Sequence, residues 1–318
     1  MVAAAPNTSE PDTAVLGVGG YACSRFPVIA VCIFGLVRNV KLSQPSLNSR
    51  VLQPLQEAGE TDLFVHTLLL AELNNNRSKE IGIQLMPGDF LRIGRACRYT
   101  AEDQDTIDET LEKSVKMLAH GHKLFDKNMM KNFLRALYGL QQVANMALAH
   151  ERKGNFEYRL VCVARADTAF LSGLPPPIVA SMLNAPPIVD QMRILVPNFH
   201  MCLGVNDRFA LGSRAAMFDV YMQRFSILQD YLKPNMNSEM LLCRWLQVKQ
   251  VSVLVVAMCV VRMRSTGVCN NRDLSGPAET PRRCMGNYSL TPPQGVPSRG
   301  NGPCWGRTCD SASLLVAS

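Results

Sequence analysis

A strand, a helix and a second strand follow one another within residues 28–67. Val28–Leu36 (VIAVCIFGL) is short, continuously apolar and rich in β-branched residues, which indicates a strand buried on both faces. Apolar residues then recur at helical spacing within residues 43–58, and Thr61–Thr67 (TDLFVHT) is typical of a second buried strand. A unit of this kind pairs its two strands in parallel. We therefore predict an α/β fold with a mixed, mainly parallel central sheet flanked by helices.

The middle of the chain holds another buried strand that stops at charged residues. Leu160–Ala164 is apolar, and Arg165-Ala166-Asp167 follows it directly. In open α/β sheets, ligands bind outside the carboxyl ends of the strands. We therefore expect the functional site near Arg165 and Asp167. The alternative is that Asp167 caps a turn and Arg165 is its surface partner.

Further elements follow from the apolar spacing. Asn128–Ala149, Arg214–Leu232 and Asn237–Leu246 are predicted helices, and Val251–Val261 is a predicted late strand that is followed by arginines. Residues 71–100 are irregular and predict a loop with one short strand at most.

A dense group of polar residues lies within Gly204–Ser213 (GVNDRFALGS). Asn206, Asp207 and Arg208 stand between a glycine and the apolar run that follows them. Polar residues packed this closely between glycines and core residues predict a rigid loop, which is where binding and catalytic side chains often lie.

Composition limits the classes of function. The formal net charge of the 318 residues is +7 and the pI is about 8.9, and the sequence has no basic run of five or more residues. This mild excess permits an anionic ligand such as a nucleotide diphosphate and does not favour nucleic acid as a partner. The G-x-x-x-x-G-K-[ST] loop of P-loop enzymes is absent from the sequence.

The cysteines and the apolar runs bear on the compartment. Eleven cysteines are scattered, and several lie inside apolar runs (Cys32, Cys162, Cys259), which predicts reduced, buried thiols and a cytoplasmic protein. The longest apolar runs are far shorter than the roughly 20 residues of a membrane-spanning helix. Residues 1–27 lack the pattern of a secretory signal.

The predicted domain organisation has three parts. Residues 1–27 are rich in Ala, Pro, Ser and Gly and are predicted to be disordered. Residues 28–268 form one α/β domain. Residues 269–318 lose periodicity and are predicted to be a disordered or poorly packed tail.

Six strings resemble the motifs of a largely uncharacterised eukaryotic glycosyltransferase-like family, and they occur in the same order as in that family. They cover residues 28–268. The strings are VCIFGLVR, DLFVHT, RYTAEDQDTID, KNFLRALYGL, RADTAF and VPNFH…GVNDRFALGS, which correspond to the family's FGLTRS, FVHT, DDQD, NLLRxLYSL, RPD and GxNDRFAxG motifs.

This family resembles nucleotide-sugar transferases of the GT-A type. The resemblance implies a nucleotide bound near the end of the first strand, and Mg²⁺ or Mn²⁺ held on the diphosphate by a carboxylate after a middle strand. It implies that Gly35 and Arg38 lie near the nucleotide and that Arg135 faces the sugar or the phosphates. Arg165 and Asp167 match the family's R-P-D position, with Asp167 as the metal ligand.

The same resemblance places the polar loop on the acceptor side. Asn206, Asp207 and Arg208 would line it, and in an inverting transferase Asp207 would take the proton of the acceptor hydroxyl. Glu239 is a second candidate for this base.

Two departures from the family pattern leave an alternative open. Ala166 replaces the family's proline, and Asn237 stands where the family tends to have histidine. The predicted function is transfer of a sugar from a nucleotide-diphosphate donor to an unknown glycan, protein or lipid acceptor. The alternative is a non-catalytic GT-A-like descendant that binds a sugar, a nucleotide or a protein. Because many such transferases work in the Golgi, the secretory pathway is the alternative to the cytoplasm.

Overall fold

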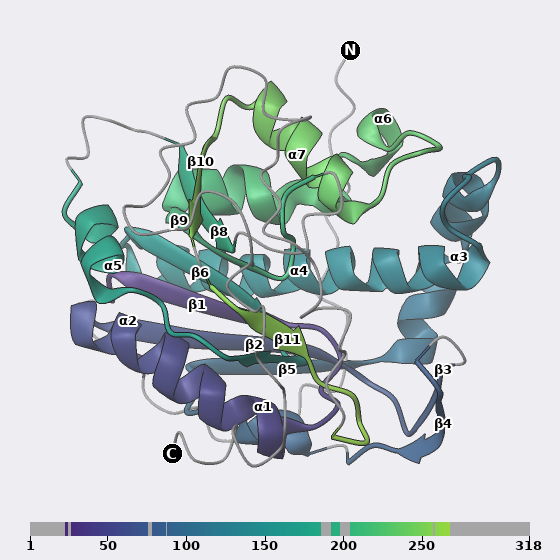
Figure 1. The fold of residues 1–318 in the computed structure, drawn as a ribbon, viewed down its shortest axis with the longest axis horizontal. Coiled ribbons are helices and arrows are strands. Elements are labelled where there is room, and N and C mark those ends of the chain that lie inside the picture. The colour runs from purple at the N-terminus through teal and green to yellow at the C-terminus, as the bar shows by residue number, and fades with distance from the viewer. Residues whose placement is uncertain are drawn as a thin grey trace, which may run out of the picture.

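The centre of the protein is a seven-stranded sheet, drawn in Figure 1 from a computed structural model. The structure describes residues 23–24, 27–75, 78–86, 88–185, 192–197, 204–256 and 258–267. The strands of the sheet are β1 (Ile29–Phe34), β2 (Thr61–Leu69), β5 (Arg98–Asp103), β6 (Leu160–Arg165), β8 (Arg193–Pro197), β9 (Phe209–Ser213) and β10 (Ser252–Val256). Their order is β10-β8-β9-β6-β1-β2-β5. Only β9 is antiparallel to its neighbours in this sheet, so the predicted mixed, mainly parallel sheet is confirmed.

Strand β1 is buried along its whole length, as its sequence predicted. Its odd-numbered side chains pack in one apolar core and its even-numbered side chains in another, because successive side chains of a strand point to opposite faces. Its pairing with β2 is parallel, which confirms the predicted strand–helix–strand unit. A sheet that is covered on both faces explains why these strands are continuously apolar.

Helices cover both faces of the sheet (Figure 1). On one face lie α1 (Val40–Leu47), the π-helical turn η1 (Asn48–Leu52), α2 (Gln53–Ala58) and α5 (Pro176–Leu183). On the other face lie α3 (Gln104–Ala119), α4 (Lys127–Gly154), η3 (Ala216–Val220), η4 (Tyr221–Phe225), α6 (Leu228–Tyr231) and α7 (Ser238–Val248). A short turn, η2 (Asp89–Arg92), precedes β5.

The chain changes direction across the sheet between β1 and β6. Along the chain, β1, β2 and β5 follow one another in one direction across the sheet, and β6 then pairs with the other side of β1. The strand order therefore reverses between β1 and β6, as in a doubly wound sheet. Phe34 at the end of β1 is the register partner of Arg165 at the end of β6. The carboxyl ends of these two strands therefore meet at the point where open α/β sheets bind their ligands.

Two small antiparallel sheets lie beside the central one. Strand β7 (Thr168–Phe170) pairs with β11 (Val260–Arg262), and β3 (Glu72–Asn75) pairs with β4 (Glu80–Gln84). The β7–β11 pair brings Arg262 next to the end of β6, because β7 follows Arg165 almost directly.

The structure corrects three of the predicted elements. Residues 71–100 hold a hairpin and β5 rather than one short strand at most. Residues 214–232 form three short helical pieces instead of one helix, with the Arg224 Nε donating to the Tyr221 carbonyl oxygen. The apolar run 251–261 is divided between β10 and β11, since β10 pairs with β8 and β11 with β7.

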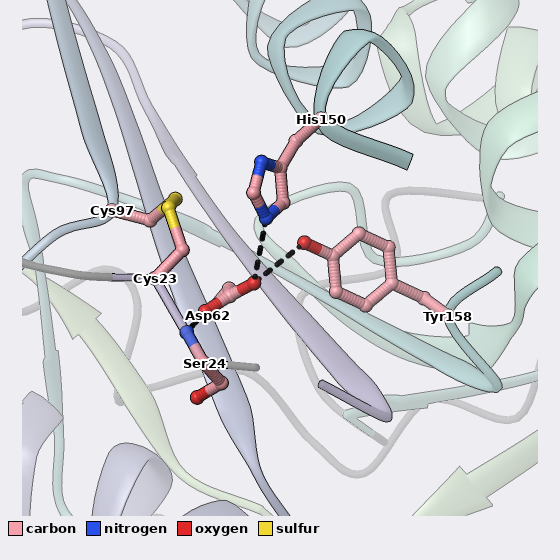
Figure 2. The surroundings of a disulfide bond; sticks show 6 residues. All are labelled: Cys23, Ser24, Asp62, Cys97, His150 and Tyr158. Carbon is pink, nitrogen blue, oxygen red and sulfur yellow. Dashed lines mark hydrogen bonds and ion pairs between the residues drawn. A yellow bond between two sulfur atoms is a disulfide. The ribbon is translucent and has the colours of Figure 1, made fainter. Parts of the chain in front are cut away.

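A disulfide bond joins Cys23 to Cys97 (Figure 2), with 4.7 Å between their Cα atoms. Cys243 and Cys259 are also disulfide-bonded. The prediction of a reduced thiol is therefore wrong for Cys259. Nothing local in a sequence marks a disulfide whose two halves are 74 residues apart.

The buried thiols of Cys32 and Cys162 are free, as predicted. Both lie in the interior of the central sheet, in β1 and β6, where burial raises the pKa of each thiol. Each therefore behaves as a small apolar side chain.

A buried carboxylate holds the chain next to the Cys23–Cys97 bond. Figure 2 shows Asp62 among Ser24, His150 and Tyr158. The Asp62 carboxylate accepts hydrogen bonds from the Ser24 backbone nitrogen (2.8 Å) and the Tyr158 hydroxyl (2.9 Å). Its Oδ2 lies 3.3 Å from the His150 Nε2. The segment before β1 is therefore fixed at two consecutive residues.

The predicted disordered segments lie largely outside the described residues, which begin at Cys23 and end at Gly267. Within that part of the chain, every helix is too short or too polar to cross a bilayer.

The Cys23–Cys97 bond closes a long loop, so its loss should lower the free energy of unfolding by about 4 kcal/mol on the chain-entropy model. Urea denaturation of Cys23→Ser, Cys97→Ser and the double variant checks this. All three variants should lose the same amount, because either substitution breaks the same bond. Losses that add in the double variant would show that the two cysteines contribute separately.

Candidate functional site

The site begins where β1 ends. Gly35 has a positive φ of 99°, which lets the chain turn out of the sheet toward Arg38. The Ala166 backbone nitrogen donates to the Phe34 carbonyl oxygen at 2.9 Å, which ties the end of β1 to the residue after β6. A proline at position 166, as in the resembling family, has no N–H to make this bond.

Asp167 and Arg165 form a bidentate ion pair at the end of β6. The Arg165 Nε and Nη2 donate to the two Asp167 oxygens, each at 2.9 Å, and only 4% of Asp167 is exposed. Burial on its own would raise the pKa of Asp167, but Arg165, Arg38 and Arg262 hold that pKa well below its usual range. The carboxylate is therefore charged, buried and surrounded by guanidinium groups.

A second buried carboxylate, Glu80, comes from β4. Its Oε2 lies 2.7 Å from the Arg38 Nη1 and 3.7 Å from the Arg264 Nη1. Its Oε1 accepts from the backbone nitrogen and hydroxyl of Ser265. The Arg38 Nε is also 3.8 Å from an Asp167 oxygen, so Arg38 links the two carboxylates. We call Arg38, Arg165, Arg262 and Arg264 the arginine cluster.

Arg38 and Arg165 were predicted to lie at this site, whereas no role was predicted for Arg262, Arg264 or Glu80. A local signal existed for Arg262 and Arg264, because they follow an apolar run that is typical of a buried strand, as Arg165 does. No local signal existed for Glu80, which lies in the region expected to be irregular and reaches the site through the β3–β4 hairpin.

The polar loop predicted to be rigid packs against the start of α7. A Cβ on Gly204 would lie 2.0 Å from the Glu239 carbonyl carbon, so only glycine fits this approach. The Val205 backbone nitrogen donates to the Glu239 carbonyl oxygen at 3.1 Å. Within the loop, the buried Asn206 side chain accepts from the Arg208 backbone nitrogen at 3.0 Å. These contacts hold the loop against the start of α7, and its rigidity stays a prediction.

Asp207 is held by groups on two other elements, α7 and η4. The Ser238 hydroxyl donates to its Oδ2, and the Nη1 of buried Arg224 lies 4.0 Å from the same oxygen. Burial would raise the pKa of Asp207, but Arg224, Arg208, the Ser238 hydroxyl and Arg165 together hold that pKa below its usual value. Neither Arg224 nor Ser238 was predicted to belong to the site.

Glu239 has the opposite electrostatic environment. Burial and the neighbouring Asp207 charge raise its pKa to about 7. Two carboxyl groups whose environments push their pKa values apart are a recurring source of acid and base assignments in active sites. At neutral pH, Glu239 can therefore gain or lose a proton while Asp207 stays ionised.

The arginine cluster and the polar loop belong to one site. The Arg165 backbone nitrogen donates to the Arg208 carbonyl oxygen at 3.2 Å. The Arg165 charge acts on Asp207, and the Arg262 charge acts on Glu239. The structure thus brings together most of the predicted site residues, which are Gly35, Arg38, Arg165, Asp167, Asn206, Asp207, Arg208 and Glu239.

Arg135 lies on α4 and is engaged elsewhere. Its Nε donates to Asp108 of α3 at 2.6 Å, its Nη2 donates to the same carboxylate, and its Nη1 donates to Asn132. Gly139, one helical turn further along α4, is the residue that approaches the end of β1, since a Cβ there would lie 3.9 Å from the Gly35 nitrogen. The role predicted for Arg135 toward sugar or phosphate stays a prediction.

The surroundings of Asp167 do not fit a divalent cation. Both of its oxygens accept from Arg165, and the only other carboxylate paired with the arginine cluster in the described ranges, Glu80, is engaged by Arg38, Arg264 and Ser265. Mg²⁺ and Mn²⁺ prefer carboxylate oxygens that are open to the metal and its waters. Within the described residues, the one group of three metal-ligating side chains is Cys23, Cys97 and His150, whose two sulfur atoms are joined in a disulfide.

Comparisons with solved structures give distant likenesses. Mouse xyloside xylosyltransferase 1 in its apo form has a TM-score of 0.32 and 11% identity, over 72% of this chain and 84% of that one. A putative glucose-1-phosphate thymidylyltransferase from Bacillus anthracis, in complex with a sucrose, has a TM-score of 0.35 and 9% identity, over 74% of this chain and 89% of that one. These scores are low, so fold and function rest on the topology and the site described above.

The search of curated proteins found no match. A family model matches residues 24–272, which include all the strands of the central sheet and all the site residues above. The chain therefore belongs to the family described as Domain of unknown function (DUF7796).

Proposed function

We propose that this protein is a glycosyltransferase that uses a nucleotide-diphosphate sugar as its donor. One observation carries the proposal. Charged residues from segments as distant as Arg38 and Arg264 converge at the carboxyl ends of β1 and β6, where the strand order reverses. Ligands of open α/β sheets bind at such a point.

The arginine cluster suits the donor's diphosphate. Guanidinium groups keep their charge at all physiological pH values and bind phosphate oxygens in a bidentate manner. The nucleoside would then lie toward the turn at Gly35, and the sugar toward the polar loop.

The polar loop supplies groups for the acceptor. A general base works best when its pKa lies near the working pH. Glu239, with a pKa raised to about 7, fits that task better than Asp207, whose pKa is lowered. We therefore assign Glu239 as the base that takes the acceptor's hydroxyl proton. Asp207 acts as the fixed charge beside it, which reverses the order of preference drawn from the sequence.

The competing function is binding of a sugar or nucleotide without catalysis. The ion pairing of Asp167 and Glu80 favours it, because both carboxylates at the arginine cluster already have partners. The two functions share a donor site and differ in whether a sugar is transferred.

Thermal unfolding with a panel of UDP- and GDP-sugars tests the donor site. A ligand present at 100 times its Kd should raise the free energy of unfolding by about 2.7 kcal/mol. Transfer is then assayed as release of UDP or GDP in the presence of glycan and protein acceptors. Stabilisation without release of UDP or GDP would support the non-catalytic function. No stabilisation by any nucleotide sugar would contradict both functions, because they share the donor site.

Glu239→Gln tests the base. The unmodified protein should become more active as pH rises through about 7, because the base acts in its ionised form. The variant should lose activity by about 10² to 10⁴-fold and lose this rise. Glu57→Gln, which changes an exposed glutamate on α2, is the matched control and should keep both the rate and the pH profile.

Stability gives a second readout of Glu239 that does not need an acceptor. The folded state holds the Glu239 proton up to about pH 7, whereas the unfolded chain releases it near pH 4.5. The raised pKa therefore stabilises the fold below this window, and that contribution is lost as pH rises through it. Glu239→Gln should remove this part of the pH dependence in urea titrations. An unchanged dependence would show that Glu239 ionises normally.

We also propose that the chain matures in an oxidising compartment of the secretory pathway rather than in the cytosol. The bonded states of Cys23, Cys97, Cys243 and Cys259 support this, because structural disulfides persist in such compartments. Protein taken from its own cells, alkylated before reduction and mapped by mass spectrometry, should contain the Cys23–Cys97 pair intact. Alkylation of both cysteines would place the chain in a reducing compartment.

A further inference from the structure

Positive charge is concentrated around Glu80 and Asp167. The Glu80 carboxylate faces the guanidinium groups of both Arg38 and Arg264, and the Arg38 Nε also lies 3.8 Å from an Asp167 oxygen. Besides burial, the positive charges of Arg38 and Arg262 lower the pKa of Arg264, so these guanidinium groups act on one another at the carboxyl ends of β1 and β6. An anion would be attracted to this place, and a divalent cation would be repelled from it.

We propose that the donor's diphosphate is neutralised by the arginine cluster itself, without a divalent metal ion, and that Asp167 is a positioning residue for Arg165 rather than a metal ligand. The proposal rests on the donor site proposed above. It departs from the Mg²⁺ or Mn²⁺ that the resemblance to GT-A transferases implies.

The geometry of Asp167 supports this role. Its two oxygens hold the Nε and Nη2 of Arg165 in one plane, and Arg165 is 26% exposed while Asp167 is 4% exposed. The carboxylate of this pair is therefore buried, whereas its guanidinium group has solvent-accessible surface. The Thr168 hydroxyl also donates to the Arg165 carbonyl oxygen at 2.6 Å, which fixes the backbone from which Arg165 extends.

Glu80 has the same relation to the two other arginines. Its Oε2 faces both Arg38 and Arg264, which are 12% and 21% exposed, while Glu80 itself is 1% exposed. Two buried carboxylates thus hold at least three partly exposed guanidinium groups. A metal ion would first have to displace these arginines from the oxygens that it needs.

The chemistry of transfer fits fixed cations. The bond between the sugar's anomeric carbon and the diphosphate oxygen breaks, and its electron pair stays on that oxygen as the nucleoside diphosphate leaves. The acceptor oxygen bonds to the anomeric carbon, and its proton goes to Glu239. The leaving diphosphate gains negative charge in this step, and preorganised guanidinium groups stabilise that charge without proton transfer.

Calorimetric titration of the full chain with inorganic pyrophosphate, UDP and GDP tests the proposal. Each titration is run with EDTA, with MgCl₂ and with MnCl₂. We expect at least one of the two nucleotides to bind, with a Kd that changes less than about threefold among the three conditions. Binding that appears only with a metal ion, or is lost in EDTA, would overturn the proposal, as would failure of all three probes to bind.

Arginine variants show whether the binding is at this site. Arg264→Gln and Arg165→Gln should each weaken nucleotide binding in EDTA by about tenfold or more, since a charge-assisted hydrogen bond to phosphate is lost. Arg152→Gln, at the exposed last turn of α4, is the matched control and should bind as the unmodified protein does. Unchanged binding by both cluster variants would overturn the proposal. Arg264 is partly exposed, so its variant tests the idea even if Arg165→Gln folds poorly.

A double-variant cycle tests the positioning role of Asp167. Asp167→Asn should weaken binding equally with and without metal ions. Added to Arg165→Gln, it should cause little further loss, because it acts through Arg165. Independent, additive losses would show a general structural effect. If the unmodified protein binds nucleotide only with a metal ion, and Asp167→Asn abolishes that binding, then Asp167 is a metal ligand instead.

Failure of this inference differs from failure of the proposed function. Sugar transfer that requires Mn²⁺ would contradict the metal-free donor site but would support the proposed glycosyltransferase activity. Metal-independent nucleotide binding with no transfer from any tested donor would support the metal-free site and favour the non-catalytic function over the glycosyltransferase.

Discussion

The bidentate ion pair between Asp167 and Arg165 is the interaction on which the rest of the site depends. A buried carboxylate is costly unless it is paired and hydrogen-bonded, and removal of one partner of such a pair costs about 3–5 kcal/mol. Asp167 meets this requirement through both of its oxygens, and Arg38 and Arg262 add to it. The carboxylate in turn lets several arginines lie close together at the carboxyl ends of β1 and β6, where their mutual repulsion would otherwise separate them.

The opposite arrangement holds on the side of the polar loop. There Asp207 and Glu239 lie near each other, and the arginines stabilise the ionised form of Asp207 more than that of Glu239. Arg224 and Arg208 lower the pKa of Asp207, while burial and the Asp207 charge raise that of Glu239. One end of the sheet therefore combines a permanent positive charge with a carboxyl group that can exchange a proton near neutral pH. This combination suits a reaction in which an anion leaves and a hydroxyl proton is removed.

Local patterns predicted the framework of the fold well and its non-local parts poorly. Strands β1, β2 and β6 were readable because burial on both faces demands a continuous apolar run. The β3–β4 hairpin was not readable, because it is short and only Leu73 and Glu80 of its two strands are buried. The division of residues 251–261 between two sheets was equally hidden, since an apolar run states that a segment is buried and not which strand it pairs with. The Cys23–Cys97 bond depends on the same kind of distant pairing.

The sequence by itself determined the fold class, the end of the sheet that carries charge, and most of the charged residues found there, because strand ends and polar loops leave local signals. Tertiary structure alone decided which charges became partners. Glu80 reaches Arg38 through the hairpin, Arg262 reaches Asp167 through the pairing of β11 with β7, and Arg135 is directed to Asp108 by the packing of α3 on α4. The electrostatic state of a carboxyl group depends on neighbours within a few ångströms, and in this protein those neighbours lie up to 185 residues away along the chain.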